Sequence, residues 1–237
     1  HSSGFSISTY LWATRYDGDM TINGQTVDLT GISLVDLVDA GELRFPPLIA
    51  FIEQDLGGWG LYFDATLAGL TFGSGDISIG PGGKIDATVD MDFTYGIANT
   101  GVVYNLSDFS SAGFDSELDI LAGVRFTYYD VDLQGTLNGG PTLIKLEETI
   151  SWLDGTAGIR LRGENENGYT YSLWGDIGLG AGFSVQALAT VGRTWNMENY
   201  DLNVFAGYRY LYQDYSSGDD AVDLANHGPI VGVKFNF

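Results

Sequence analysis

Cysteine is absent from the 237-residue chain, and cationic side chains are scarce: 10 Lys and Arg stand against 31 Asp and Glu, a net charge of −21. Without cysteine there is no disulfide scaffold and no thiolate metal site. The shortage of positive charge argues against a nucleic-acid partner, since such proteins carry a basic surface. Hydrophobic residues make up 44% of the chain, too large a share for a disordered acidic protein.

A long hydrophobic run is also missing. The longest uncharged stretch lies between Asp176 and Arg193 and has 16 residues, many of them Gly, Ala or Ser. A membrane-spanning helix needs about 20 predominantly apolar residues. If the chain crosses a membrane, it must do so as a closed β-barrel, because only helices and closed barrels satisfy every backbone polar group in lipid.

Glycine, with 34 residues, and aromatic side chains, with 14% of the sequence, are the abundant components. The final segment shows how they are arranged. One face of residues 228–237 is apolar, and the opposite face is mostly small, polar or charged, so the side chains alternate with the period of a β-strand. In a transmembrane barrel the apolar face contacts lipid and the polar face lines the lumen.

The same alternation recurs along the chain and predicts an all-β, antiparallel, up-and-down transmembrane barrel. We expect ten strands, with eight or twelve as alternatives, at 5–16, 43–55, 59–73, 84–105, 116–134, 147–163, 168–180, 184–196, 200–215 and 226–237. Residues 5–237 form a single domain in this interpretation. His1-Ser2-Ser3-Gly4 resembles the end of an expression tag and is left out of it.

The connections differ in length between the two ends of the predicted barrel. Short turns are expected at 55–58, 164–168 and 196–199, with a somewhat longer one at 106–115, and longer acidic loops at 17–42, 135–146 and 216–225. Within the first long loop, Asn23-Gly24 predicts a tight hairpin. Ser33 is a candidate cap for a short helix over 33–40. We expect this hairpin and helix to lie outside the cell, over or into the barrel mouth.

Two sets of residues follow from the alternation. One is a lumen charge network, either a lattice of ion pairs or the wall of a narrow hydrated pore: Glu53, Asp64, Asp90, Asp92, Arg125, Asp154, Arg160, Asp176, Arg209 and Lys234. The other is an aromatic girdle at the membrane interfaces: Trp59, Tyr128, Tyr169, Trp195, Tyr208, Tyr210, Tyr212, Phe235 and Phe237.

Several short motifs occur in order along the chain: Tyr10-Leu-Trp-Ala13 followed by Gly18-Asp19, Leu121-Ala-Gly-Val-Arg125, Asp154-Gly-Thr-Ala-Gly-Ile-Arg160, Gly175-Asp176 followed by Gln186-Ala187, Gly207-Tyr-Arg-Tyr210, and Gly228-Pro229 through to Phe237. With these motifs the chain resembles a group of uncharacterised proteobacterial outer-membrane β-barrel proteins. The resemblance implies an outer-membrane location and a terminal Phe237 read by the barrel-assembly machinery. It supplies no catalytic residues.

Candidate chemistry is limited. His227, the only histidine besides His1, lies at the start of the last predicted strand, beside a loop with Ser216, Ser217 and Asp219, from which a His–Ser–Asp set could form. Asp219, Asp220 and Asp223 lack the spacing of a dedicated calcium loop, so we expect solvated acids and no metal site.

The leading functional hypothesis is a small outer-membrane barrel that acts as a structural component or a narrow passive channel for small solutes. The alternatives are a lipid-modifying enzyme with a rim site near His227 and a surface-binding module that uses loop 17–42. We expect no cofactor and no catalytic residue under the leading hypothesis. Outer-membrane lipids and lipopolysaccharide are the expected partners.

Overall fold

The computed structural model describes residues 4–33, 43–73, 87–137 and 142–237, and its regular structure in these ranges is entirely β. The strands are β1 (Phe5–Trp12), β2 (Arg15–Ile22), β3 (Gln25–Asp28), β4 (Ile32–Ser33), β5 (Leu43–Asp55), β6 (Trp59–Gly73), β7 (Ala87–Ser111), β8 (Phe114–Leu137), β9 (Thr142–Asn165), β10 (Tyr169–Gly180), β11 (Gly182–Asn196), β12 (Asp201–Ser217) and β13 (Asp220–Asn236). Among the described residues, no helix is long and apolar enough to cross a membrane.

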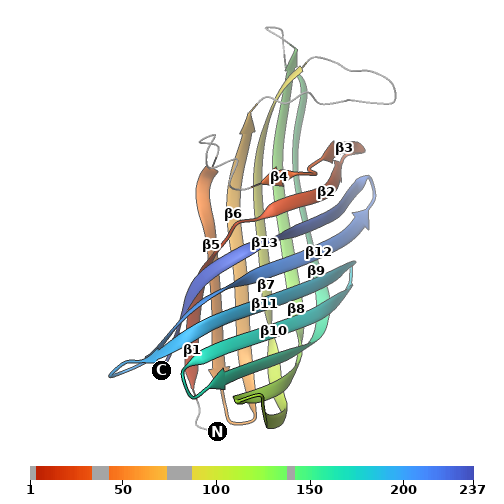
Figure 1. Cartoon of the computed structure of the whole chain (residues 1–237). Helices are drawn as coiled ribbons and strands as arrows, with labels where there is room; N and C mark the ends of the chain where they lie inside the picture. Colours follow the sequence, from red (N-terminus) through yellow and green to blue (C-terminus); the bar gives the residue numbers. More distant parts are fainter. Residues whose placement is uncertain (1–3, 34–42, 74–86, 138–141) are drawn as a thin grey trace.

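Ten of these strands close into an antiparallel barrel. From β5 to β13 each strand pairs with its neighbours in sequence, and β1 pairs with both β5 and β13, which closes the sheet. The prediction of ten strands is therefore confirmed, and the alternatives of eight and twelve are wrong. Both termini lie at the same end (Figure 1), which we call the terminus end; the opposite end is the mouth.

The first strand is longer than β1 alone. β2 continues along β13 in the register that β1 set, from Trp12 opposite Ile230 to Arg15 opposite His227. Its other edge separates from β5 above Thr9, since the pairing of β1 with β5 covers only Phe5 to Thr9. There β3 and β4 pair with β2 in place of β5.

The hairpin predicted in the first loop is present. β2 and β3 are joined by the two residues Asn23 and Gly24, which both have positive φ values of 49° and 75°. This is the backbone geometry of a type I′ turn, for which the Asn-Gly pair is the strongest short signal. The helix predicted over 33–40 lies, apart from Ser33 in β4, outside the described residues.

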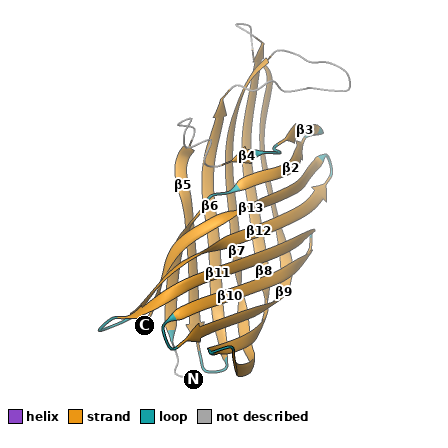
Figure 2. Cartoon of the chain, in the orientation of Figure 1, coloured by secondary structure: helices purple, strands orange, loops and turns teal. Residues whose placement is uncertain are grey.

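Three of the predicted loops are wrong in extent, because the strands continue into them. In 135–146, β8 runs to Leu137 and β9 begins at Thr142, and residues 138–141 lie outside the described residues. β7 and β8 extend to a turn at Ala112 and Gly113, so 106–115 is a hairpin. β12 and β13 likewise extend through 216–225 and turn at Gly218 and Asp219. A strand segment outside the lipid needs no apolar outer face. Its outward residues can therefore be Ser or Asp, and the alternation of apolar and polar residues is lost from the sequence there. Figure 2 shows that β7 and β8 also rise above β10–β13 on the mouth side.

The two faces of the sheet differ as predicted. Outward side chains are apolar and largely exposed, including Leu11, Ile159, Leu173, Val191 and Val231, which are 50% to 67% exposed. Inward positions hold the buried polar and charged side chains, with Arg125 and Arg209 each 1% exposed. A water-soluble domain would place these two sets the other way round, since a contiguous apolar surface of this extent requires a lipid or protein cover.

Candidate functional site

Three layers of side chains occupy the barrel interior, and the first lies near the terminus end. Arg160 donates to both carboxylate oxygens of Glu53, at 2.5 and 2.8 Å, and pairs with Asp119 at 2.9 Å. Arg162 contacts Glu53 at 3.1 Å and Glu117 at 2.8 Å. Glu53, Asp119 and Arg160 are all buried, so each charge is stabilised by close opposite charges from strands on different sides of the barrel.

The second layer crosses the middle of the barrel. Arg209 on β12 donates to Asp64 on β6 and to Gln186 on β11, both at 2.7 Å, and also to the hydroxyl of Tyr10. Its guanidinium lies 4.9 Å from the centre of the Trp12 ring.

Arg125 extends this layer across β8. It pairs with Asp176 on β10 at 2.5 Å and donates to Asn99 on β7 at 2.6 Å and to Ser184 on β11 at 2.7 Å. Seven of the barrel strands, β1, β6, β7, β8, β10, β11 and β12, thus contribute to one cross-linked layer at this level.

The third layer, on the mouth side, is apolar and aromatic. The rings of Tyr16, Phe93, Tyr95 and Tyr129 pack with centroids 5.5 to 6.3 Å apart. They belong to a continuous buried cluster that also includes Met20, Trp152, Leu211, Val222 and Leu224. Leu29 of the first loop is 3% exposed in this cluster, so the loop adds to the interior packing.

Hydrogen bonds from Asn23 and Gly24 hold the β2–β3 hairpin in place at the mouth. The backbone N–H of Asn23 donates to Asp220 at 2.8 Å, and the Gly24 N–H donates to the Asp219 carbonyl at 2.9 Å. The Asn23 side chain reaches Glu148 on β9 at 3.3 Å. Asp219 and Asp220, considered above as possible calcium ligands, instead hold this hairpin. Among the described residues no cluster of acidic or histidine side chains could hold a metal ion.

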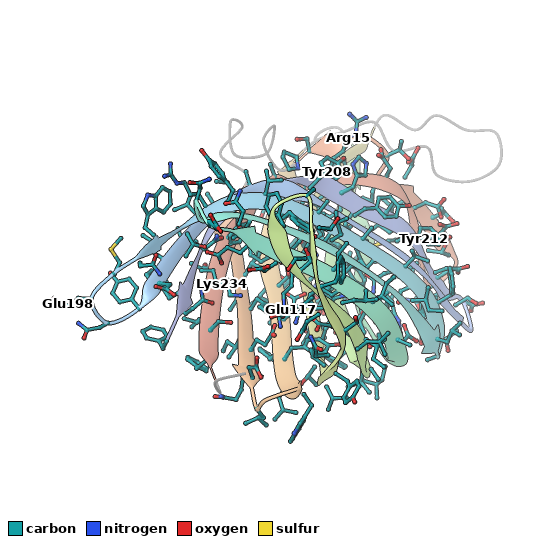
Figure 3. All side chains as sticks on the ribbon, turned by 60° about the horizontal axis from the view of Figure 1, so that its bottom comes forward. Arg15, Glu117, Glu198, Tyr208, Tyr212 and Lys234 are labelled. Carbon is teal, nitrogen blue, oxygen red and sulfur yellow. The ribbon has the colours of Figure 1, made fainter. Side chains whose placement is uncertain are left out.

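A vestibule of about 610 Å³ is open at the terminus end and extends past the first charged layer to Asp64, Gln186 and Arg209 of the second. Its inner wall includes Trp174, Phe205 and Ile230, and its entrance includes Asp201 and Glu164. Lys234 and Glu117 lie within the ring of strands in the view toward this end (Figure 3). None of the four rings of the third layer is part of the lining of this cavity.

Most of the predicted lumen charges are buried inside the barrel: Glu53, Asp64, Arg125, Asp154, Arg160, Asp176 and Arg209. Within the described ranges Asp154 forms no ion pair, and it accepts hydrogen bonds from the Trp152 indole and the Gly182 N–H, at 2.9 and 2.8 Å. Lys234 lines the vestibule.

The placement of Asp92 in the lumen is wrong. Its neighbours Phe93 and Tyr95 alternate inward on β7, so Asp92 lies on the outer face, where it accepts a hydrogen bond from Thr71 at 2.6 Å. The alternation of this segment was assigned to the wrong faces, because its inward side chains are aromatic at Phe93 and Tyr95. The side chain of Asp90 lies outside the described residues.

Sequence reasoning missed Asp119, Arg162 and Glu117. Asp119 lies opposite Arg160 in the β8–β9 register, and Arg162 follows Arg160 on the same face. Their strand positions alone would have identified Asp119 and Arg162, because each shares the inward face with a residue already placed in the network.

The predicted girdle residues are on the outer face, in two groups. Tyr128, Tyr208, Tyr210 and Tyr212 lie on the mouth side. The remaining girdle residues lie towards the terminus end: Trp59, Tyr169, Trp195, Phe235 and Phe237. Two bands of aromatic side chains at the ends of an apolar belt are typical of a transmembrane barrel.

His227 is on the outer wall, and its partners differ from those considered in the sequence. Its Nε2 lies 2.6 Å from Asp17 Oδ2 on β2, and its Nδ1 lies 2.6 Å from the Tyr208 hydroxyl on β12. Neither Ser216 nor Ser217 contacts it among the interactions of the described residues. The three side chains tie β2, β13 and β12 together on the outside of the barrel.

Comparisons with known proteins bear on the fold. No protein-family model matches the chain, and no curated protein matches it in sequence. Among solved structures, the outer-membrane protease OmpT of Escherichia coli is similar over 100% of this chain and 97% of its own, with 10% identity and a TM-score of 0.50. Ail of Yersinia pestis covers 100% of both chains with 12% identity and a TM-score of 0.38.

At such low identity the similarity to OmpT concerns the fold and not the activity. Together with the exposed apolar belt and the closed ten-strand sheet, it shows that the chain has the fold of a bacterial outer-membrane β-barrel.

Proposed function

We propose that this protein is a rigid, non-conducting structural barrel of the outer membrane. The observation that carries the proposal is the middle charged layer, in which Arg209 and Arg125 cross the lumen to strands on its other side and are fully buried there. A barrel of about this size has an interior that side chains can fill. The aromatic cluster on the mouth side adds a second barrier.

This packing favours the structural half of the leading hypothesis over the passive channel. A hydrated pore would leave its lining charges solvated, whereas Asp64, Asp176 and Arg125 are each at most 8% exposed. In this proposal the vestibule reaches no further than Arg209, which is part of its lining. The proposal includes two expected partners. Lipopolysaccharide would surround the mouth-side girdle, and the barrel-assembly machinery would recognise the exposed Phe237.

Planar-bilayer recording tests the proposal directly. We expect the purified wild-type protein to insert without stable conductance steps. A variant that combines Arg209→Ala and Arg125→Ala with Tyr95→Ala and Tyr129→Ala should conduct, because it opens both the middle layer and the aromatic layer on its mouth side. Arg15→Ala is the matched control, since Arg15 is exposed on the outer wall. Reproducible wild-type conductance of a fixed size would contradict the structural proposal.

One observation favours a second candidate, an enzyme at the rim. Asp17 and His227 form the hydrogen-bonded pair that an acid–base catalyst uses, and Tyr208 provides an adjacent hydroxyl. Lipid extracts from cells that express wild-type or His227→Gln protein, compared by mass spectrometry, distinguish the two candidates. A lipid product that depends on His227 would favour the enzyme; identical profiles would favour a purely structural contact.

The surface-binding alternative depends on the first loop. In its described part, the hairpin contacts Asp220 and Glu148, and Leu29 packs inward. These contacts favour a role for residues 17–33 in closing the mouth.

A further inference from the structure

Arg193 is the best candidate for an unassigned binding site on the outer wall. It is exposed on the outward face of β11, three residues before the strand ends at Asn196. Its guanidinium lies 5.2 Å from the centre of the Tyr169 ring on β10 and 5.5 Å from that of Trp195 on its own strand. Two aromatic rings of the terminus-end girdle therefore hold one cation between them.

The charge of Arg193 is not neutralised within the described part of the chain, where no carboxylate forms an ion pair with it. Two acids are close in sequence. Asp201 accepts a hydrogen bond from Asn196 at 3.0 Å, and Glu198 is at the tip of a turn that projects away from the barrel (Figure 3). This contrasts with the exposed Arg15 and Lys145, which pair with Asp17 and Glu147.

Arg193 lies at the boundary between the apolar belt and the turns of the terminus end. On the mouth side of it lies the apolar belt, with Val191 67% and Leu173 50% exposed. On the other side are the short turns of the terminus end, which face the periplasm in barrels of this class. The guanidinium is thus at the level where acyl chains give way to headgroups in the periplasmic leaflet.

We propose that Arg193, Tyr169 and Trp195 form a binding site for the phosphate of an anionic glycerophospholipid of that leaflet. A guanidinium presents a planar fork of N–H donors that fits a phosphate, and stacking on aromatic rings restricts its orientation in advance. The acyl chains of the same lipid lie along Val191 and Leu173, and the indole N–H of Trp195 is an additional donor at headgroup level.

Native mass spectrometry of the purified full-length protein in a neutral detergent tests the site, with phosphatidylglycerol titrated as the probe. We expect one phosphatidylglycerol to bind with higher affinity than the others and Arg193→Gln to weaken that binding about fivefold, the effect of one interfacial cation. Arg193→Lys should retain part of the affinity, because it keeps the charge without the planar fork. Trp195→Leu should weaken binding about twofold to fivefold through the lost cation–π contact.

Arg15→Gln is the matched control and should leave binding unchanged, since Arg15 is at the other end of the barrel and already paired. The heat-dependent shift of folded barrels on gels checks that each variant is folded. Equal affinity of Arg193→Gln and wild type would overturn the proposal, as would an equal loss in Arg15→Gln. Displacement of the lipid by sodium phosphate at the same concentration would also overturn it, because the site would then be one for a free anion. Equally tight binding of phosphatidylcholine would overturn the preference for an anionic lipid.

Discussion

Replacement of Arg209 by methionine should destabilise the barrel strongly, because it leaves a carboxylate without its cation in the interior. Arg209 and Asp64 are 1% and 3% exposed and 2.7 Å apart. After the change, Asp64 retains only the Asn99 amide at 3.1 Å and the Tyr10 hydroxyl at 3.4 Å. Removing one partner of a buried pair costs about 3–5 kcal/mol.

The assay is urea unfolding of the protein in lipid vesicles, followed by tryptophan fluorescence. Arg209→Met with Asp64→Leu should recover much of the loss, since no unpaired charge then remains. Arg15→Met, which breaks an exposed pair with Asp17, should cost less than about 1 kcal/mol. If Arg209→Met cost no more than this control, water would have to solvate Asp64, and the reasoning that the lumen is packed at this level would be refuted.

Three further predictions concern Gly18 on β2, Asp28 in the first loop, and the contact between Tyr208 and His227 on the outer wall. Gly18 has a φ of +134°, and a Cβ at this position would lie 2.1 Å from the Asp223 carbonyl oxygen. Gly18→Ala should therefore lower the free energy of unfolding by about 1–3 kcal/mol. Gly175→Ala is the control and should lower it far less, because the nearest atom to a Cβ there is 3.9 Å away. The hydroxyl and backbone N–H of Thr30 hold the pKa of Asp28 below its ordinary value, so the stabilisation from this contact is present at neutral pH and is lost as the pH falls through that lowered pKa. Carbon-13 NMR titration of Asp28 checks this, and an ordinary pKa would count against the turn. Tyr208→Phe should cost about 1 kcal/mol or less in urea unfolding, because its bond to His227 is on an exposed face; a larger loss would mean that the outer contact is needed for closure of the barrel.

The fold was largely predictable because the membrane imposes alternation on every strand that crosses it. The predicted segments 59–73 and 168–180 match the observed strands β6 and β10 closely, since one face must be apolar against lipid. The prediction failed where that constraint ends. Beyond the belt, the outward face of β13 at Asp223 is polar like any loop, so the sequence offers no signal that the strand continues there.

The sequence predicted which charged residues point into the barrel, but not which of them form ion pairs with one another. The alternation placed Arg160, Arg209 and Asp64 inward, but pairing across the lumen depends on strand tilt and register. These bring Arg160 to Glu53, 107 residues away in the chain. His227 shows the same limit: its contact with Asp17, 210 residues away, arises because β2 continues along β13 after the first strand leaves β5.

The packed lumen can be tested most directly by cysteine accessibility, which the absence of native cysteine makes unambiguous. Asn203→Cys places a thiol in the vestibule, and a charged, membrane-impermeant thiol reagent can be added to oriented vesicles from either side. We predict rapid labelling from the periplasmic side and none from the mouth side. Labelling at similar rates from both sides would show a continuous aqueous path and would contradict the account.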